Sequence, residues 1–224
     1  MIVLADGAAG SRAALDATWP GWLEADAKVV AADGGAHHAG ELGLRIDRWV
    51  GDGDSLGEAG IAHLIAEGIP VDRVRPDKDQ SDTELALHAA LEWNPTAITF
   101  LGALGGPRID HALANLTLLA MPALAGRDVR LVGVDARVRL LRAPADDGEP
   151  TRAELDGRAD ELVTLLPVGG DAIGVTTTGL AFPLDDETLI DGLTRGLSNR
   201  RTAAVATVTL HGGRLLIVET PATL

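Results

Sequence analysis

The segment Lys28-Val29-Val30-Ala31-Ala32-Asp33-Gly34-Gly35-Ala36 decides the fold class of this chain. Its apolar run indicates a buried strand over 28–32, and the Asp-Gly-Gly that follows ends that strand. A helix-like segment then continues over 35–42. A strand followed at once by a helix is the repeating unit of a parallel sheet covered by helices. We therefore expect an α/β protein.

The same alternation extends over about the first 130 residues. Short apolar runs predict strands at Ile2–Leu4, Lys28–Ala32, Arg48–Val50, Arg73–Arg75, Ala97–Leu101 and Val129–Val132. Helices are predicted at Ser11–Trp19, Gly35–Leu42, Gly57–Glu67, Asp82–Leu91 and His111–Leu119. Leu87 with Leu91, and Leu113 with Leu116, have the spacing of an inward-facing helical stripe. Ligands of such sheets bind beyond the carboxyl ends of the strands.

The pattern changes after about residue 133. The segment Ala143–Arg158 is rich in Pro, Gly and charge and is predicted to be a loop. Extended, β-branched segments follow at Leu162–Val168, Ile173–Thr178, Ala203–Leu210 and Arg214–Glu219, and His211-Gly212-Gly213 has the composition of a hairpin turn. We therefore predict a mostly parallel α/β domain over 1–134 and a smaller all-β domain over 135–224.

Composition excludes several classes of function. The chain has 224 residues, 46% of them hydrophobic, with a formal net charge of −14 and no cysteine. Such an acidic chain does not attract nucleic acid, and disulfides and thiolate metal sites are impossible. No apolar run reaches the length of a membrane span, and the first residues do not resemble a signal peptide. We expect a cytoplasmic protein without a membrane or nucleic-acid partner.

Two acidic clusters are the main functional signal. Asp52-Gly53-Asp54 and Asp79-Gln80-Ser81-Asp82 each follow a predicted strand, about 25 residues apart. Crowded carboxylates repel one another, and a divalent cation bound with a nucleotide phosphate removes that repulsion. In extended backbone Asp52 and Asp54 would point the same way and share one cation. Turn formation remains an alternative, as does a capping box of Ser81 and Glu84. Lys78 is either a surface charge or a phosphate ligand.

Two further strand-to-helix junctions carry similar residues. Asp33-Gly34-Gly35 would let the backbone approach a ligand closely, or Asp33 would simply cap a helix. The stretch GALGGPRIDHALAN, residues 102–115, holds Arg108, Asp110 and His111. Asp110 is a possible helix cap, and His111 is interpreted as a structural histidine. Because all these junctions fall on one edge of the predicted sheet, they favour a single Mg-nucleotide site.

The ordered set DGG, GDGDS, KDQSDTELAL, GGPRIDHALANL, TTTGLAFPL and GLSN resembles the thiamine pyrophosphokinase (thiamine diphosphokinase) family over nearly the whole chain. The resemblance implies an α/β domain followed by a β-sandwich, a homodimer with sites at the subunit interface, and ATP and thiamine as substrates. The implied reaction transfers the pyrophosphoryl group of ATP to the thiamine hydroxyl and yields thiamine diphosphate and AMP.

The resemblance also implies roles for particular residues. The catalytic acids would be Asp52, Asp54, Asp79 and Asp82, with Mg²⁺ held by Asp52, Asp54 and Asp79 and the proton accepted by Asp79 or Asp82. ATP would be bound by Asp33, Gly34, Lys78 and Arg108. Thiamine would be bound by Asp110, Ser198 and Asn199, the last two from the partner subunit.

Two departures from the family pattern stand out. Pro107 separates the glycine pair from Arg108, where many relatives run Gly-Gly-Arg directly. Eukaryotic relatives carry a C-terminal Trp that stacks on thiamine, whereas no aromatic residue follows Phe182 here, and the last strand contains Leu215 and Ile217 at its centre. The thiamine ring must therefore be held in another way, for example by aliphatic contacts.

Two other functions remain open at the level of sequence. A pyrophosphokinase acting on a hydroxymethylpterin alcohol would have the same acidic half, so the β domain would have to discriminate between the two substrates. A regulator that binds nucleotide or thiamine without turnover is a second alternative. The full set of acids argues against such a regulator, because binding alone needs fewer carboxylates.

Overall fold

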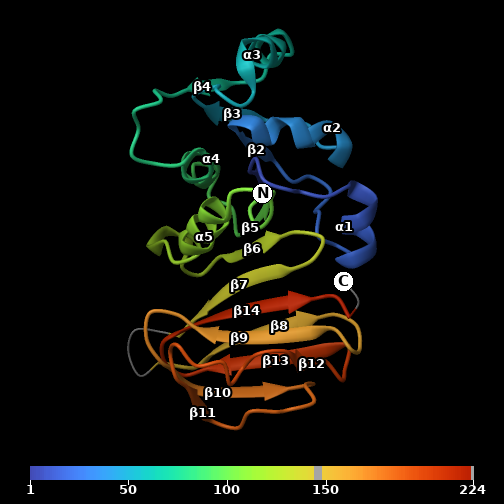
Figure 1. Ribbon diagram of the computed structural model, residues 1–224, viewed down its shortest axis with the longest axis vertical. Helices are drawn as coiled ribbons and strands as arrows, with labels where there is room; N and C mark the ends of the chain where they lie inside the picture. Colours follow the sequence, from blue (N-terminus) through green and yellow to red (C-terminus); the bar gives the residue numbers. More distant parts are fainter. Residues whose placement is uncertain (144–147, 223–224) are drawn as a thin grey trace. The chain divides into compact units, whose positions relative to one another are not determined.

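The computed structural model describes residues 1–143 and 148–222. The chain divides into two compact units, Met1–Val134 and Asp135–Leu224. Helices α1 to α5 all belong to the first unit, which is blue to green in Figure 1, and the second unit is built from strands. No helix in the described residues has the length and apolar character that crossing a membrane requires.

The N-terminal unit is built on a parallel sheet with the strand order β6-β5-β1-β2-β3-β4. The strands are β1 (Ile2–Leu4), β2 (Val29–Ala32), β3 (Arg48–Gly51), β4 (Val71–Arg73), β5 (Ala97–Leu101) and β6 (Asp128–Val132). The helices are α1 (Arg12–Thr18), α2 (His38–Leu42), α3 (Gly57–Ala66), α4 (Asp82–Leu91) and α5 (Ile109–Leu118), with the short 3-10 helices η1 (Asp33–His37) and η2 (Pro122–Leu124).

Burial on both sheet faces explains why the central strands β1 and β2 are continuously apolar. Alternate strand residues such as Leu4 and Ala31 pack with Leu15 of α1 and Leu42 of α2 in one core. Trp49 lies fully buried in the same core, and its indole N–H donates to the carbonyl of Asp33 at 3.0 Å. Helix α4 packs against β1, β2 and β3. The packing therefore fixes the strand ends, and with them the residues that follow each strand.

The C-terminal unit is a β-sandwich. One antiparallel sheet has the order β12-β9-β14-β7 and the other the order β11-β10-β13-β8. Its strands are β7 (Arg137–Arg142), β8 (Thr151–Asp156), β9 (Leu162–Pro167), β10 (Ala172–Thr178), β11 (Glu187–Leu189), β12 (Asn199–Arg200), β13 (Val205–Leu210) and β14 (Arg214–Thr220). Inward-facing residues of both sheets, among them Leu155, Leu165 and Ile217, form a second apolar core.

This unit also buries a set of charged side chains, the arginine–glutamate cluster. Glu219, 1% exposed, accepts hydrogen bonds from Arg137 at 2.7 Å and from Arg201 at 3.0 Å. Arg139 reaches the same carboxylate at 3.3 Å, and Arg201 lies 3.6 Å from Glu161. Arg201 is 0% exposed. Paired in this way, the buried charges compensate one another within the unit.

The predicted α/β fold with a smaller β-sandwich is confirmed, while several local predictions are wrong. Leu113 was expected to face inward but is 57% exposed. The strand expected at Arg73–Arg75 forms at Val71–Arg73. Thr151–Asp156, expected to be part of a loop, form β8, whose exposed Arg152 and Glu154 hid the inward residues of the strand. Residues 144–147 of that predicted loop lie outside the described residues.

The predicted hairpin turn at His211-Gly212-Gly213 is also wrong. Strand β13 pairs with β8 and β10, whereas β14 pairs with β7 and β9. The turn therefore carries the chain from one sheet of the sandwich to the other. Gly213 has a φ of 86°, and a Cβ there would lie 2.2 Å from the carbonyl oxygen of Asp171. Close approach to another strand, rather than hairpin geometry, requires this glycine.

Candidate active site

A cavity of about 390 Å³ lies at the carboxyl ends of the parallel strands in the N-terminal unit. Segments that follow β1, β2, β3 and β5 line it, together with the start of α4. Five of the predicted site residues are part of the lining: Asp33, Asp54, Lys78, Asp82 and Arg108. Its volume lies in the usual range for small-molecule sites. The expected position of the site, beyond the strand ends, agrees with this cavity.

Asp33 follows β2 and begins η1 with a buried side chain. Its φ of 40° is a left-handed conformation that aspartate tolerates better than most residues. The carboxylate accepts the backbone N–H groups of Ser55 and Leu56 at 3.0 and 3.4 Å. Burial raises the pKa of Asp33 above its ordinary value, and the Ser55 N–H only partly offsets that effect. Asp33 thus joins the end of β2 to the loop after β3.

Asp52 and Asp54 follow β3, but the backbone between them is not that of a strand. Gly53 between them has a φ of 87°, so the backbone is not extended, and the alternation of a strand does not set the directions of the two side chains. One Asp52 oxygen, Oδ1, accepts the N–H of Asp54 at 3.1 Å. The Asp54 side chain is exposed and accepts the Ser55 hydroxyl at 3.1 Å. The expected common cation for these two residues therefore lacks the geometry on which it was based.

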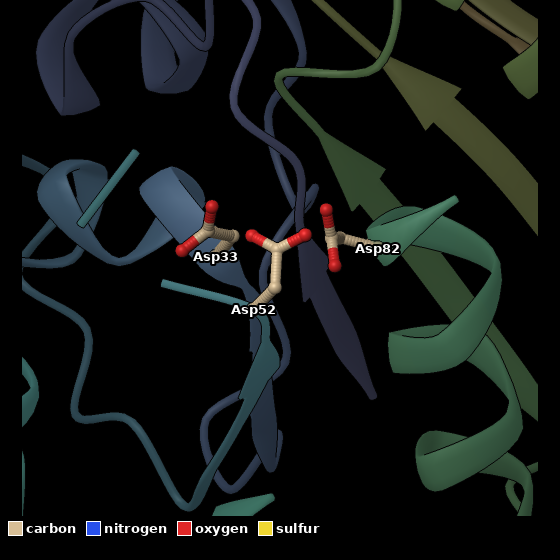
Figure 2. Close-up of side chains that lie close together, drawn as sticks. All are labelled: Asp33, Asp52 and Asp82. Atoms are coloured by element: carbon tan, nitrogen blue, oxygen red, sulfur yellow. The ribbon is translucent and has the colours of Figure 1, made fainter. Parts of the chain in front are cut away.

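Asp82 comes to the site as the first residue of α4. Ser81 caps that helix by accepting the N–H of Glu84 at 3.2 Å, as half of the predicted capping box requires. Asp33, Asp52 and Asp82 each offer an oxygen, and these oxygens lie within 4.8 Å of one another. Figure 2 shows the Asp52 carboxylate between the other two. We call this set the carboxylate triad.

Lys78 neutralises part of the triad's charge. Its Nζ donates to Oδ2 of Asp52 at 2.7 Å and lies 2.9 Å from Oδ1 of Asp82. The hydrogen bond from Lys78 lowers the pKa of Asp52. Burial, the largest single effect on Lys78, lowers its pKa, but the two carboxylates outweigh burial and raise the pKa above its ordinary value. Lys78 is therefore a charged partner of the triad and not a plain surface residue.

Four predicted residues of this unit are not part of the cavity lining: Gly34, Asp52, Asp79 and Asp110. Asp79 is exposed and does not line it, because it precedes the helix cap rather than beginning the helix. Gly34 is buried, and a Cβ there would lie 2.3 Å from a carboxylate oxygen of Asp6. The missing side chain of Gly34 therefore leaves room for Asp6, whereas the sequence suggested close approach to a ligand.

Asp6 lines the cavity and was missed by the sequence analysis. A signal was present, because Asp6-Gly7 follows β1 just as Asp33-Gly34 follows β2 and Asp52-Gly53 follows β3. Three adjacent parallel strands thus end in the same Asp-Gly pair. The repetition at one sheet edge would have added Asp6 to the candidate acids.

The segment after β5 forms another wall of the cavity. Arg108 lines it and is exposed, and it binds Asp110 through a 2.6 Å contact between Nη2 and Oδ2. The hydrogen bond from Arg108 lowers the pKa of Asp110 to about 2. His111, which was interpreted as structural, lines the cavity with an exposed side chain. Asn115 is buried and fixes the loop by donating to the Ala103 carbonyl at 3.0 Å.

Ser198 and Asn199 lie in the C-terminal unit, where Asn199 has a structural role. Its side-chain amide donates to the Phe182 carbonyl at 2.6 Å and accepts the Phe182 N–H at 3.0 Å. Ser198 is exposed with a φ of 56°, and its N–H donates to Thr164 at 2.9 Å. The Phe182 ring is 65% exposed. Asn199 therefore fixes the backbone of an exposed aromatic residue that the sequence analysis passed over.

Fold and site together define the class of the protein as a nucleotide-dependent phosphotransferase, with carboxylates and a lysine at the ends of parallel strands. Two family models match the chain. "Thiamin pyrophosphokinase, catalytic domain" matches residues 21–131, and "Thiamin pyrophosphokinase, vitamin B1 binding domain" matches residues 152–215. The chain belongs to the thiamin pyrophosphokinase family.

Relatives agree with this assignment. The chain is 27% identical over 172 residues to the thiamine pyrophosphokinase of Bacillus subtilis (strain 168), covering 75% of this chain and 76% of the relative. The crystal structure of the thiamin pyrophosphokinase from Geobacillus thermodenitrificans is similar with a TM-score of 0.78 and 25% identity, over 100% of this chain and 99% of that one. The Candida albicans structure, at 16% identity and a TM-score of 0.75 over 98% and 88% of the two chains, supports the fold alone.

Proposed function

We propose that the cavity at the strand ends binds ATP as its magnesium complex, and that thiamine receives the pyrophosphoryl group there. The enzyme is a thiamine diphosphokinase: it transfers the pyrophosphoryl group of ATP to the thiamine hydroxyl and releases AMP. The observation that carries the proposed location is the carboxylate triad, whose oxygens lie within 4.8 Å of one another at the strand ends.

The triad fits a magnesium ion by its chemistry. Mg²⁺ prefers hard oxygen donors and is commonly bound by a few carboxylates together with phosphate oxygens. Oδ1 of Asp82 is buried and pairs with the Lys78 ammonium at 2.9 Å without the geometry of a hydrogen bond, so it has capacity for a further ligand. When bound, the ion would neutralise and orient phosphate oxygens. We propose Asp33, Asp52 and Asp82 as its ligands, in place of the set with Asp54 and Asp79.

The remaining residues of the cavity would position the reactants. Transfer of a phosphoryl-type group depends mainly on positioning and on neutralising charge. Lys78 and Arg108 line the cavity with positive charge and are proposed to contact phosphate. Asp54 lines it outside the triad with an exposed carboxylate, so we propose Asp54 as the acceptor of the hydroxyl proton. Of the two acceptors expected from the sequence, Asp79 does not line the cavity and Asp82 belongs to the triad.

The C-terminal unit is proposed to bind the thiamine rings. An exposed aromatic ring can stack on a heterocycle and attracts a cationic one through its face. Phe182 offers such a ring, and the Asn199 side chain is hydrogen-bonded to both the N–H and the carbonyl of Phe182. We propose that Asn199 acts by positioning Phe182, and that Ser198 and Asp110 contribute polar contacts. Phe182 would thus replace the aromatic residue that the last strand lacks.

We propose a homodimer because apolar side chains of the C-terminal unit are exposed. Large apolar side chains of the C-terminal unit are exposed, among them Ile173, Phe182, Leu193 and Leu197 at 54–65%. Exposed apolar side chains of this size commonly mark an interface. We propose that a second copy of the chain covers them and completes the thiamine site. A monomeric mass in solution at full activity would refute the dimer. A cytoplasmic location is proposed because ATP is a substrate.

An assay of the purified protein with magnesium, ATP and thiamine tests the proposal. We expect thiamine diphosphate and AMP in equal amounts, and no AMP when a hydroxymethylpterin alcohol replaces thiamine. Formation of ADP instead of AMP would contradict pyrophosphoryl transfer. Binding of ATP by calorimetry without any AMP would favour a regulator. The match of the second unit to a vitamin B1 binding domain supports thiamine over the pterin.

A further inference from the structure

Lys78 lines the cavity, but its ammonium group contacts two carboxylates of the triad. Its Nζ lies 2.7 Å from Asp52 Oδ2 and 2.9 Å from Asp82 Oδ1. The lysine side chain is 14% exposed and the Asp52 side chain 10% exposed. The ammonium therefore stands between two of the three carboxylates and points away from open solvent. It occupies the position that a cation shared by these carboxylates would take.

A metal ion and the ammonium would compete for the same oxygens. Mg²⁺ binds oxygen at about 2.0–2.1 Å, so an ion held by Asp52 and Asp82 would come very close to the present Nζ position. Two cations a few ångströms apart in a partly buried site repel strongly. The ammonium also pairs with Asp82 Oδ1 at 2.9 Å, although the angles of this contact are not those of a hydrogen bond. The lysine is thus a partial substitute for a better ligand.

The choice of lysine is itself informative. The chain contains 17 arginines and only two lysines, Lys28 and Lys78. Arginine binds carboxylates through a planar fork with two parallel hydrogen bonds and would hold the pair firmly. Lysine carries a compact charge on a flexible four-carbon stem, which can turn from one anion to another. Although most basic residues of this chain are arginines, position 78 has a lysine, whose ammonium group can move from one anionic partner to another.

We propose that Lys78 is an exchangeable counter-cation, which balances the carboxylate triad in the free enzyme and gives way to the metal when the metal–nucleotide complex binds. The ammonium then turns toward the phosphates, since Lys78 already lines the cavity. The free site avoids the repulsion of three adjacent carboxylates, and binding of the nucleotide is coupled to binding of the metal. This proposal rests on the proposed metal site.

The first test measures Mn²⁺ binding without nucleotide by electron paramagnetic resonance. Lys78→Met removes the competing cation, so Mn²⁺ should bind about tenfold more tightly, equivalent to about 1.4 kcal/mol. Lys28→Met is the matched control: it removes the same charge at a residue that lies over the Trp93 ring, and it should leave the affinity unchanged. Equal affinity of the unmodified protein and Lys78→Met would overturn the exchange.

Asp52→Asn separates failure of the exchange from failure of the metal site. If Asp52→Asn weakens Mn²⁺ binding while Lys78→Met has no effect, the metal site stands and the exchange is wrong. If Asp52→Asn and Lys78→Met both leave Mn²⁺ binding unchanged, both proposals are wrong. The thermal unfolding midpoint of each variant shows whether the variant is folded at the temperature of the Mn²⁺ binding measurement.

The second test uses the unmodified chain, so it does not depend on the folding of a variant. Trace acetylation followed by mass spectrometry gives the ratio of modification at Lys78 to that at Lys28. The free enzyme should show a low ratio, because the carboxylates hold the Lys78 ammonium. Mg²⁺ alone should raise the ratio severalfold, and addition of a non-hydrolysable ATP analogue should lower it again. A ratio unaffected by Mg²⁺ would show that the lysine keeps its place and would overturn the proposal.

Discussion

The carboxylate triad of the N-terminal unit and the arginine–glutamate cluster of the C-terminal unit both crowd charges together, but the triad borders a cavity, whereas the cluster is enclosed in the sandwich. Three carboxylates face a single lysine in the triad, and Asp33 and Asp82 line the cavity. In the cluster, Glu219 forms ion pairs with three arginines, and Glu219 is 1% exposed.

This difference separates a binding site from a structural element. A closed, buried set of charges resists removal of any member, because the partner is left uncompensated. An open set with surplus charge is unfavourable until a ligand arrives, and acids whose pKa is displaced, as it is upward for Asp33 and downward for Asp52, are common at functional sites. The four predictions below test this contrast, from the largest expected effect to the smallest.

Removal of Arg201 should have the largest effect, and the effect should be on stability. Arg201→Met leaves Glu219 and Glu161 with less compensation in the sandwich, so the free energy of unfolding should fall by about 3–5 kcal/mol. Denaturant unfolding measures the change. The neighbouring Arg200→Met is the control, because its ion pair with Asp160 is exposed and contributes about 1 kcal/mol or less. A similar decrease in the free energy of unfolding in both variants would show that the buried cluster does not stabilise the unit more than an exposed ion pair does.

Removal of Asp52 should affect activity rather than folding. Asp52→Asn deprives the proposed metal of a ligand, so kcat should fall by about a hundredfold or more, the scale seen when one group that stabilises a transition state is lost. Asp79→Asn is the control, since Asp79 is exposed and outside the carboxylate triad. Product formation and the unfolding midpoint are measured for both. Equal activity of the two variants would contradict the assignment of the triad.

The sequence predicted the fold and the position of the site better than the grouping of the acids. Apolar runs ending in Asp-Gly identified the strands and their common edge. The pairing of Asp52 with Asp54 assumed extended backbone, and Gly53 at a φ of 87° invalidates that assumption. The approach of Asp82 to Asp33 depends on how α4 packs on the sheet, which no local pattern contains.

The β-sandwich was harder to predict for a related reason. Strand β8 has charged residues on its outer face, so its composition resembled that of a loop. The connection at Gly213 could be distinguished from a hairpin only by knowing that β13 and β14 belong to different sheets. Phe182 was not predicted as a site residue, because the sequence does not show that its ring is exposed. Its hydrogen bond with Asn199 also joins residues 17 positions apart, which no local pattern indicates.

Removal of the Phe182 ring should raise the KM for thiamine. Phe182→Ala should increase it about tenfold, the scale of one base or ring stacked on an aromatic side chain, with little change in the KM for ATP. Phe182→Tyr keeps the ring and should restore most of the affinity. Steady-state kinetics with each substrate varied in turn gives both constants. An unchanged KM for thiamine in Phe182→Ala would remove this residue from the proposed site.

Asp33→Asn should give a smaller, pH-dependent gain in stability without divalent cations. Because the pKa of Asp33 is raised in the folded protein, folding disfavours its ionised form. The carboxylate therefore costs stability as the pH rises from the ordinary value of 3.8 through the raised folded pKa, and the cost is absent at lower pH. Asparagine tolerates the left-handed backbone and can still accept the Ser55 N–H.

Urea unfolding in the presence of a chelator, at several pH values, measures this effect. The stability of Asp33→Asn relative to the unmodified protein should increase from acidic to neutral pH and then level off. Asp52, Asp54 and Asp82 lie near Asp33 and are kept unchanged in both proteins. A difference in stability that stays constant with pH would show that the Asp33 carboxylate is not under electrostatic strain.

Anomalous scattering from a crystal grown with Mn²⁺ and a non-hydrolysable ATP analogue tests the central claim most directly. The claim is that the carboxylate triad is left open for a metal–nucleotide complex. It predicts a Mn²⁺ peak bonded to oxygens of Asp33, Asp52 and Asp82 and to phosphate, with the Lys78 ammonium moved away from Asp52. A peak bonded to Asp54 and Asp79, or a nucleotide bound away from these strand ends, would contradict it.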